Sequence, residues 1–389
     1  MNRGPASRIR VGLALACAGL TAGCGTQAAT VAVTRPPAVT APLSTSLTTA
    51  QGTWAIAVMG GSAASHNNFW QLFVRRANTG RWSLATPEGV ADNGGLVAAG
   101  GNGSLVVGFR PSQELAYSPL ATSTDAGLNW TPGLLDAALA DTPGAIAVGP
   151  SGRTLALLQD GTIEAAPTAD DAAAGRWVPL ATLKALAASA PGRSCGLKGM
   201  TAVSFGPDQN PIAAGSCVRP GAAGVFTDAG GTWRSAGLTL PGNGPSMGTV
   251  RVLGLTAIPG GNAALLAVGT SLLAAWWDGT RWTVSAPVTA DGVRALGFGP
   301  GGSAWLLLDS ERAETIAGAA GSTWRALPPV PAGTTVLAPP GTGTLAPGTG
   351  GSYDALAVSG SRLTVWRLAR GAWGKVQQIT VPVQYGSSG

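Results

Sequence analysis

The chain has 389 residues, of which 45% are hydrophobic and only 11% are charged, and its formal net charge is +6. This balance excludes a disordered polar protein, which would be rich in charge and poor in apolar residues. The 59 glycines and 28 prolines disfavour long helices and favour short strands with many turns. The basic residues are scattered singly, so we expect no nucleic-acid partner.

Residues 1–23 have the pattern of a signal peptide. A basic start precedes an apolar run over 11–23, which is shorter than the roughly 20 residues that a spanning helix needs. The run ends in Leu20-Thr21-Ala22-Gly23-Cys24, which resembles the lipobox of bacterial lipoproteins, although the family prefers an aliphatic residue at the position of Thr21. The resemblance implies lipid attachment at Cys24 and a location at the outer face of the cytoplasmic membrane. Secretion after cleavage near Ala28-Ala29 is the alternative.

Residues 24–51 are rich in alanine, threonine, proline and serine, and Arg35 is their one charge. Such a segment has too few apolar residues to build a core, so it predicts a flexible tether. Residues 52–389 then form the folded domain. Within it, the segments 53–60 and 69–76 have the pattern of strands, and they are one strand fewer than the later parts of the domain have before each tryptophan turn. The C-terminal segment 379–389 has a strand pattern and is the expected replacement, because a strand from the far terminus would cover an otherwise exposed sheet edge.

A tryptophan recurs every 42 to 56 residues, each time after a small or polar turn. Apolar strands joined by Gly/Pro turns, as at Gly149-Pro150 and Gly206-Pro207, recur between these tryptophans. One unit thus contains four short strands, A to D, with the tryptophan at the start of strand D. This period predicts an all-β, seven-bladed β-propeller of four-stranded antiparallel blades. The series is Trp82, Trp130, Trp177, Trp233, Trp282, Trp324 and Trp373.

The turn before Trp130 matches the Asp-box motif S-x-D-x-G-x-x-W at every fixed position: Ser123, Asp125, Gly127 and Trp130. A second copy keeps Asp228, Gly230 and Trp233, and a shortened copy keeps Asp278 and Trp282. The chain therefore resembles the bacterial-neuraminidase-repeat propellers, which include sialidases, sortilin-type receptors, xyloglucanases and the photosystem II assembly factor. The resemblance implies a structural role for the box, on the turn between strands C and D, where Asp accepts backbone N–H bonds and Gly permits positive φ.

The residues that catalysis would need are scarce. Sialidases of this family use three arginines, an acid/base carboxyl, and a tyrosine paired with a glutamate. This chain has three tyrosines, Tyr117, Tyr353 and Tyr385, and its one histidine, His66, leaves no partner for a metal or triad site. The inner A strands, such as 145–149 and 201–206, are nearly free of charge, and Arg294 alone could point a cation into the channel. We predict no catalytic residues, no metal and no cofactor.

The two cysteines outside the leader and lipobox, Cys195 and Cys217, predict a disulfide, because an even pair in an exported protein favours one. It would pin the long loop 181–199 to the end of a strand B, with Cys217 opposite a point near residue 200.

The B–C and D–A loops share one face of a propeller and hold most of the scarce charges. Arg110, Glu114, Arg219 and Arg312 are the candidate binding residues on this face. The predicted function is non-catalytic binding of a protein or cell-envelope glycan by a membrane-anchored monomer. An Asp-box glycoside hydrolase or lyase is the alternative, and a dehydrogenase propeller with a quinone-type or metal cofactor is a third reading that the lack of histidine and of acidic clusters disfavours.

Overall fold

The computed structural model describes residues 45–48, 51–60, 69–77, 79–87, 96–101, 103–109, 120–132, 143–241, 248–290, 292–318, 323–339 and 353–382. All of them belong to the compact unit Val39–Gly389. The predicted signal peptide, the lipid-attachment candidate Cys24 and most of the predicted tether lie outside the described residues.

The described strands form six sheets, and consecutive strands pair antiparallel in sets of four. The largest sheet joins two such sets in the order β26-β25-β24-β23-β1-β2-β3-β4. Its strands are β1 (Thr45–Thr48), β2 (Gly52–Met59), β3 (Phe69–Arg76), β4 (Trp82–Leu84), β23 (Val293–Phe298), β24 (Ala304–Leu308), β25 (Ala313–Ile316) and β26 (Arg325–Ala326).

Three further sheets contain four strands each. The first holds β5 (Leu96–Gly101), β6 (Ser104–Phe109), β7 (Leu120–Ser123) and β8 (Thr131–Pro132); the second holds β9 (Ala145–Val148), β10 (Thr154–Leu157), β11 (Ile163–Ala166) and β12 (Val178–Ala181); the third holds β27 (Thr334–Ala338), β28 (Asp354–Ser359), β29 (Arg362–Ala369) and β30 (Ala372–Thr380).

The remaining two sheets have a short fifth strand beside the four. One consists of β13 (Leu197–Phe205), β14 (Pro211–Cys217), β15 (Ala222–Asp228), β16 (Trp233–Ser235) and β17 (Leu238–Thr239); the other consists of β18 (Val250–Ile258), β19 (Gly261–Val268), β20 (Ser271–Trp277), β21 (Trp282–Val284) and β22 (Val288–Thr289).

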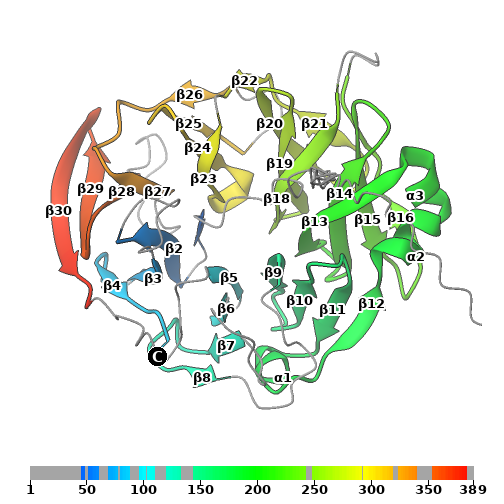
Figure 1. Cartoon of the computed structure of the whole chain (residues 1–389), viewed down its shortest axis with the longest axis horizontal. Coiled ribbons are helices and arrows are strands. Elements are labelled where there is room, and N and C mark those ends of the chain that lie inside the picture. The colour runs from blue at the N-terminus through cyan, green and yellow to red at the C-terminus, as the bar shows by residue number, and fades with distance from the viewer. Residues whose placement is uncertain are drawn as a thin grey trace, which may run out of the picture. The chain divides into compact units, whose positions relative to one another are not determined.

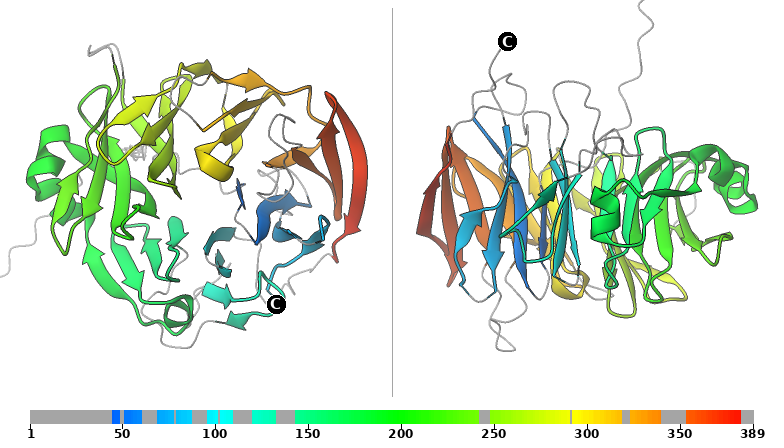
Figure 2. Two further views of the ribbon diagram at one scale, coloured as in Figure 1. Left: turned by 180° about the vertical axis from the view of Figure 1, so that it is seen from behind. Right: turned by 90° about the horizontal axis from the view of Figure 1, so that it is seen from below.

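Within the unit Val39–Gly389 the sheets stand radially around a common axis, with the first strand of each set innermost (Figure 1). This radial arrangement of antiparallel sheets is that of a β-propeller. Turns of the same kind meet across neighbouring sheets: Gly60 N donates to Gly360 O at 3.1 Å, and Ser151 N donates to Gln209 Oε1 at 3.3 Å. Neighbouring sets therefore run in the same direction, and the side view of Figure 2 shows their strands standing along the axis of the ring. We call the end where the first strands begin the entry end, and the opposite end the turn end.

The hydrophobic core lies between neighbouring sheets rather than in one central mass. One cluster joins Val106 and Leu120 of the β5–β8 sheet to Ala156 and Trp177 of the next sheet, and the other clusters likewise combine residues from neighbouring sets. A four-stranded sheet has two apolar faces and cannot bury both alone, so each set depends on its two neighbours for stability.

The first set is completed from the N-terminal side, which corrects two expectations from the sequence. Residues 45–48, which the sequence placed in the tether, form β1; it pairs antiparallel with β2 and parallel with β23. The predicted closing segment 379–389 does not take this position: residues 379–380 end β30, the outer strand of the last set, and residues 383–389 lie outside the described residues. Thr45–Thr48 can occupy the position between β2 and β23 without strong apolar character, because both neighbouring strands pair with its backbone. In addition, Ser46 accepts a hydrogen bond from Trp305 Nε1 at 3.1 Å.

Helices are few and short. The 3₁₀ helix η2 (Pro300–Gly302) and α1 (Ala169–Ala173) occupy connections within sets, and the segment predicted as the long loop 181–199 contains α2 (Leu183–Ala188) and α3 (Ala190–Cys195). Thr182 and Ser189 cap the N-termini of α2 and α3 by accepting from Ala185 N and Gly192 N. These capping bonds stabilise two helices that the sequence analysis did not predict. Of the helices described, none has the length and apolar character needed to cross a membrane.

Candidate binding face and central cavity

The first strands enclose a cavity of about 480 Å³ on the axis of the ring. Its walls come from β1, β5, β9, β13, β18 and β23, with Ile146, Phe205 and Phe298 among the apolar side chains and Thr201 and Ser204 among the polar ones. The described residues that line it include no titratable side chain. As the sequence predicted, inner strands of small and apolar residues surround the channel, and this lining offers neither a proton donor nor a base.

Groups with potential for acid–base chemistry lie elsewhere. Arg294, expected to be able to point inward, is absent from the cavity lining and donates to the carbonyl oxygens of Asp309 (3.0 Å) and Thr334 (3.5 Å). Burial raises the pKa of Tyr353 to about 12, which opposes formation of a phenolate nucleophile. Burial, reinforced by the charge of Asp160, raises the pKa of Glu164, but this carboxyl does not line the cavity either. Among the described residues, no group of three or more His, Cys, Asp or Glu could hold a metal.

The predicted binding face corresponds to the entry end. Arg219 is exposed in the turn between β14 and β15. Arg312 lies in the turn before β25, where its Nε is 3.3 Å from Glu314 Oε1 and its guanidinium donates to Thr289 O of the neighbouring sheet. Arg312 thus ties two sheets together and is less available to a ligand than Arg219. Of the four candidate binding residues, Arg110 and Glu114 lie outside the described residues, as do Tyr117 and His66, so the structure places only Arg219 and Arg312 at this end.

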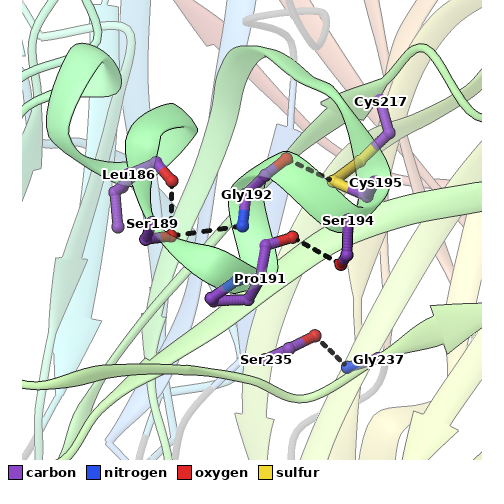
Figure 3. Close-up of a disulfide and its surroundings, with 9 residues drawn as sticks. All are labelled: Leu186, Ser189, Pro191, Gly192, Ser194, Cys195, Cys217, Ser235 and Gly237. Atoms are coloured by element: carbon purple, nitrogen blue, oxygen red, sulfur yellow. Dashed lines mark hydrogen bonds between the residues drawn. A yellow bond between two sulfur atoms is a disulfide. The ribbon is translucent and has the colours of Figure 1, made fainter.

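Cys195 at the end of α3 and Cys217 at the end of β14 form a disulfide, with Cα atoms 5.4 Å apart (Figure 3). Cys217 pairs with Leu197, not with a point near residue 200, because β13 contains two irregularities in its register. Gly192 fits closely under α2: a Cβ there would overlap the carbonyl oxygen of Leu186. The two helices are thereby fixed to the entry end of the β13–β17 sheet.

The full Asp-box copy forms a closed turn between the third and fourth strands, β7 and β8. Asp125 Oδ1 accepts from the backbone N–H groups of Asn129 (2.9 Å) and Leu128 (3.0 Å), and Ser123 Oγ accepts from Gly127 N (2.8 Å). Gly127 has φ +80, which explains glycine at this position. The hydrogen bonds from Asn129, above all, lower the pKa of Asp125 to about 2. Every donor comes from the turn itself, so this carboxylate stabilises the turn and is not directed at a ligand.

The other two copies form turns with the same chemistry. Asp228 accepts from Gly231 N at 2.8 Å, beside Gly230 with φ +66. Asp278 accepts from the backbone N–H groups of Thr280 (2.8 Å) and Arg281 (2.9 Å), and hydrogen bonds led by the Thr280 hydroxyl lower the pKa of Asp278 to about 2. All three turns lie at the turn end, away from the candidate binding residues.

The recurrent tryptophans stand at or next to the start of the fourth strands, and two of them join neighbouring sheets by a hydrogen bond to a backbone carbonyl. Trp282 Nε1 donates to Ala236 O at 2.9 Å, and Trp373 Nε1 donates to Pro328 O at 3.3 Å. Each acceptor follows the fourth strand of the preceding set. The indole therefore supplies both apolar area and a directional contact between sheets.

A buried ionic cluster joins the first and last sets, and the sequence analysis missed it. The carboxylate of Asp354, which is fully buried, accepts from Arg75 Nη1 (2.6 Å), Arg367 Nε (2.7 Å) and Trp82 Nε1 (2.9 Å). Arg75 also donates to Pro339 O at 2.8 Å and lies over the Trp82 ring. A charge inside an otherwise apolar strand segment, as in FWQLFVRR and DALAV, is the signal that could have indicated it.

Comparison with known proteins identifies the fold but no family: no family model matches the chain, and no curated protein does. A solved structure of a candidate 6-phosphogluconolactonase from Bacteroides uniformis has 14% identity and a TM-score of 0.50, covering 85% of this chain and 97% of that chain. A protein from Lactobacillus plantarum has 13% identity, the same coverage and a TM-score of 0.50. YCF48 from Cyanidioschyzon merolae has 16% identity and a TM-score of 0.44, covering 90% of this chain and 98% of that chain. At these identities the likeness concerns the fold alone.

Proposed function

We propose that this protein is an exported, lipid-anchored, seven-bladed propeller of the Asp-box class that binds a protein or cell-envelope glycan without catalysis. The blade count follows if the eight-stranded sheet is divided where β1 meets β23, because each remaining run then has four principal strands. The Asp-box assignment is supported by the carboxylate-capped turns at Asp125, Asp228 and Asp278.

The single observation that carries the non-catalytic proposal is the neutral lining of the central cavity. Hydrolysis of a glycoside needs a proton donor and a nucleophile or base on opposite sides of the scissile bond. A phosphorylated lactone, the substrate class named for the Bacteroides uniformis neighbour, would also need cations for its phosphate. The described lining of the cavity provides none of these groups. Binding is therefore assigned to the entry end, where Arg219 is exposed.

An activity screen tests this proposal against the hydrolase alternative. The purified chain is incubated with fluorogenic glycosides, including sialosides, with polysaccharides and with 6-phosphogluconolactone. We expect no turnover above that of a heat-denatured sample. Turnover that disappears when Arg110, Arg312 or Tyr117 is replaced would establish the hydrolase instead.

Anchoring is tested separately by metabolic labelling with a fatty acid. We expect label in the wild-type chain and none in Cys24→Ala, with the wild type in the membrane fraction. Equal labelling of both chains, or a wild type recovered entirely from the medium, would contradict the anchor and leave the binding proposal to its own test.

A further inference from the structure

Four basic residues gather around the disulfide at the entry end of the ring. Lys184 lies in α2, Arg193 in α3, Lys198 at the start of β13 and Arg219 in the β14–β15 turn; we call these four residues the basic corner. Direct backbone bonds connect their segments: Arg219 N donates to Cys195 O at 3.1 Å, and Val218 N donates to Gly196 O at 2.8 Å. The segments that carry Arg193, Lys198 and Arg219 are thus held together, and α2, which carries Lys184, packs against α3.

The charges of the basic corner face solvent and lack acidic partners. All four residues are exposed, and none has a carboxylate of the described residues within 4.0 Å. Arg193 donates to Ala188 O, which leaves its other donors available. Asp160 lies in the neighbouring β10–β11 turn, but its carboxylate accepts from Thr162 N and Oγ1 within that turn at 2.8 and 3.0 Å.

The basic corner also contains an exposed apolar side chain on a rigid support. Val218, next to Arg219, is 55% exposed, although it immediately follows Cys217, which is 1% exposed. The disulfide restrains the β14–β15 turn, and Gly196, with φ +67, ends α3 beside Val218. An exposed apolar residue beside Arg219 on a restrained turn suits a surface that is anionic outside and apolar beneath.

The direction of β1 relates the basic corner to the chain that precedes it. β1 runs parallel to β23, a first strand, so its Thr45 end points toward the entry end. The chain that precedes Thr45 therefore joins β1 at the same end of the ring as the basic corner.

From these observations we infer that the basic corner rests on the anionic phospholipid headgroups of the membrane to which the protein is anchored, so that the entry end faces the bilayer. This inference depends on the proposed export and anchoring. The headgroup phosphates pair with Lys184, Arg193, Lys198 and Arg219, and Val218 enters the interface between them. The lipid anchor and the basic corner then act as two membrane contacts on one chain, which strengthens the weaker of them.

Vesicle binding of the full chain carrying Cys24→Ala tests the inference without an acyl anchor. The vesicles contain equal parts of phosphatidylglycerol and phosphatidylcholine, with pure phosphatidylcholine as the neutral comparison. The triple variant Arg193→Gln, Lys198→Gln, Arg219→Gln should bind the anionic vesicles on the order of a hundredfold more weakly, at about fivefold per charge. Raising the salt concentration should weaken binding by the unsubstituted chain and have less effect on the triple variant.

The matched control is Arg81→Gln, Arg234→Gln, Arg325→Gln, which removes the same charge from exposed positions near the starts of fourth strands. It should bind like the unsubstituted chain. Equal weakening by both triple variants, or by neither, would overturn the inference, as would binding to an anionic polysaccharide but not to vesicles. If the first triple variant does not fold, Lys198→Glu alone provides the same test. Fatty-acid labelling of the Cys24-containing chain is independent of all these results, so failure of the anchor and failure of the basic corner are distinguishable.

Discussion

Replacing Asp354 by alanine is expected to lower the free energy of unfolding by about 3–5 kcal/mol, the range for breaking a buried ion pair by removing one partner. The carboxylate is 0% exposed, and Arg75, its partner at 2.6 Å, has only 9% of its side chain exposed. Burial already lowers the pKa of Arg75, and Asp354 offsets part of that effect. Without Asp354, the guanidinium would keep only Pro339 O and Thr53 Oγ1 as acceptors among the described residues.

Arg367 should contribute less to this loss, because 34% of its side chain is exposed and water can replace the carboxylate. Arg75→Met should therefore cost less than Asp354→Ala, since Asp354 retains Arg367 and Trp82 as donors. The matched control is Arg281→Gln: its pair with Asp278 spans 3.6 Å with both side chains largely exposed, and such exposed pairs contribute little to stability.

Equilibrium unfolding in urea measures these differences, and hydrogen exchange locates them. Because the cluster joins β28 and β29 to β3 and β4, exchange in Asp354→Ala should increase first in β1–β4 and β27–β30. A cost below about 1 kcal/mol, or equal costs for Asp354→Ala and Arg281→Gln, would refute the argument that buried charge at this junction controls ring closure.

Three further predictions follow from local contacts. Peptide mapping without reduction should recover Cys195 linked to Cys217, and loss of the bond should cost about 3 kcal/mol; two free thiols in the purified protein would contradict it. The pKa of Asp125 is about 2 when folded and about 3.9 in an unfolded chain, so its stabilisation is complete above pH 4 and is lost as the pH falls toward 2. The unfolding free energy of Asp125→Asn should therefore change less than that of wild type over this interval, and parallel pH curves would refute the assignment. Trp282→Phe should cost about 1 kcal/mol more than Trp324→Phe in urea unfolding, because the Trp282 indole donates to Ala236 O whereas the buried Trp324 N–H has no partner among the described residues; equal costs would show that this hydrogen bond adds nothing.

Features encoded by neighbouring residues could be predicted from the sequence. The tryptophan period indicated antiparallel strands in repeated sets, and the Ser123-to-Trp130 motif indicated a turn closed by its own side chains. The turn rests on contacts between residues a few positions apart, and each set is built from strands that are consecutive in the sequence, so composition and spacing carry the information. The scarcity of charged residues in the first strands could also be predicted, because it depends only on the residues within each strand.

Only the tertiary structure decided which distant segments meet. Thr45–Thr48 has no pattern that marks it as a strand; it becomes one because β2 and β23 leave a slot whose backbone groups need partners. Arg75 and Asp354 are 279 residues apart, so no local rule pairs them, and their burial results from closing the ring. Likewise, Lys184, Arg193, Lys198 and Arg219 are scattered cations along the chain. They form one surface because two capped helices, a disulfide and the β14–β15 turn fold against the same end of one sheet.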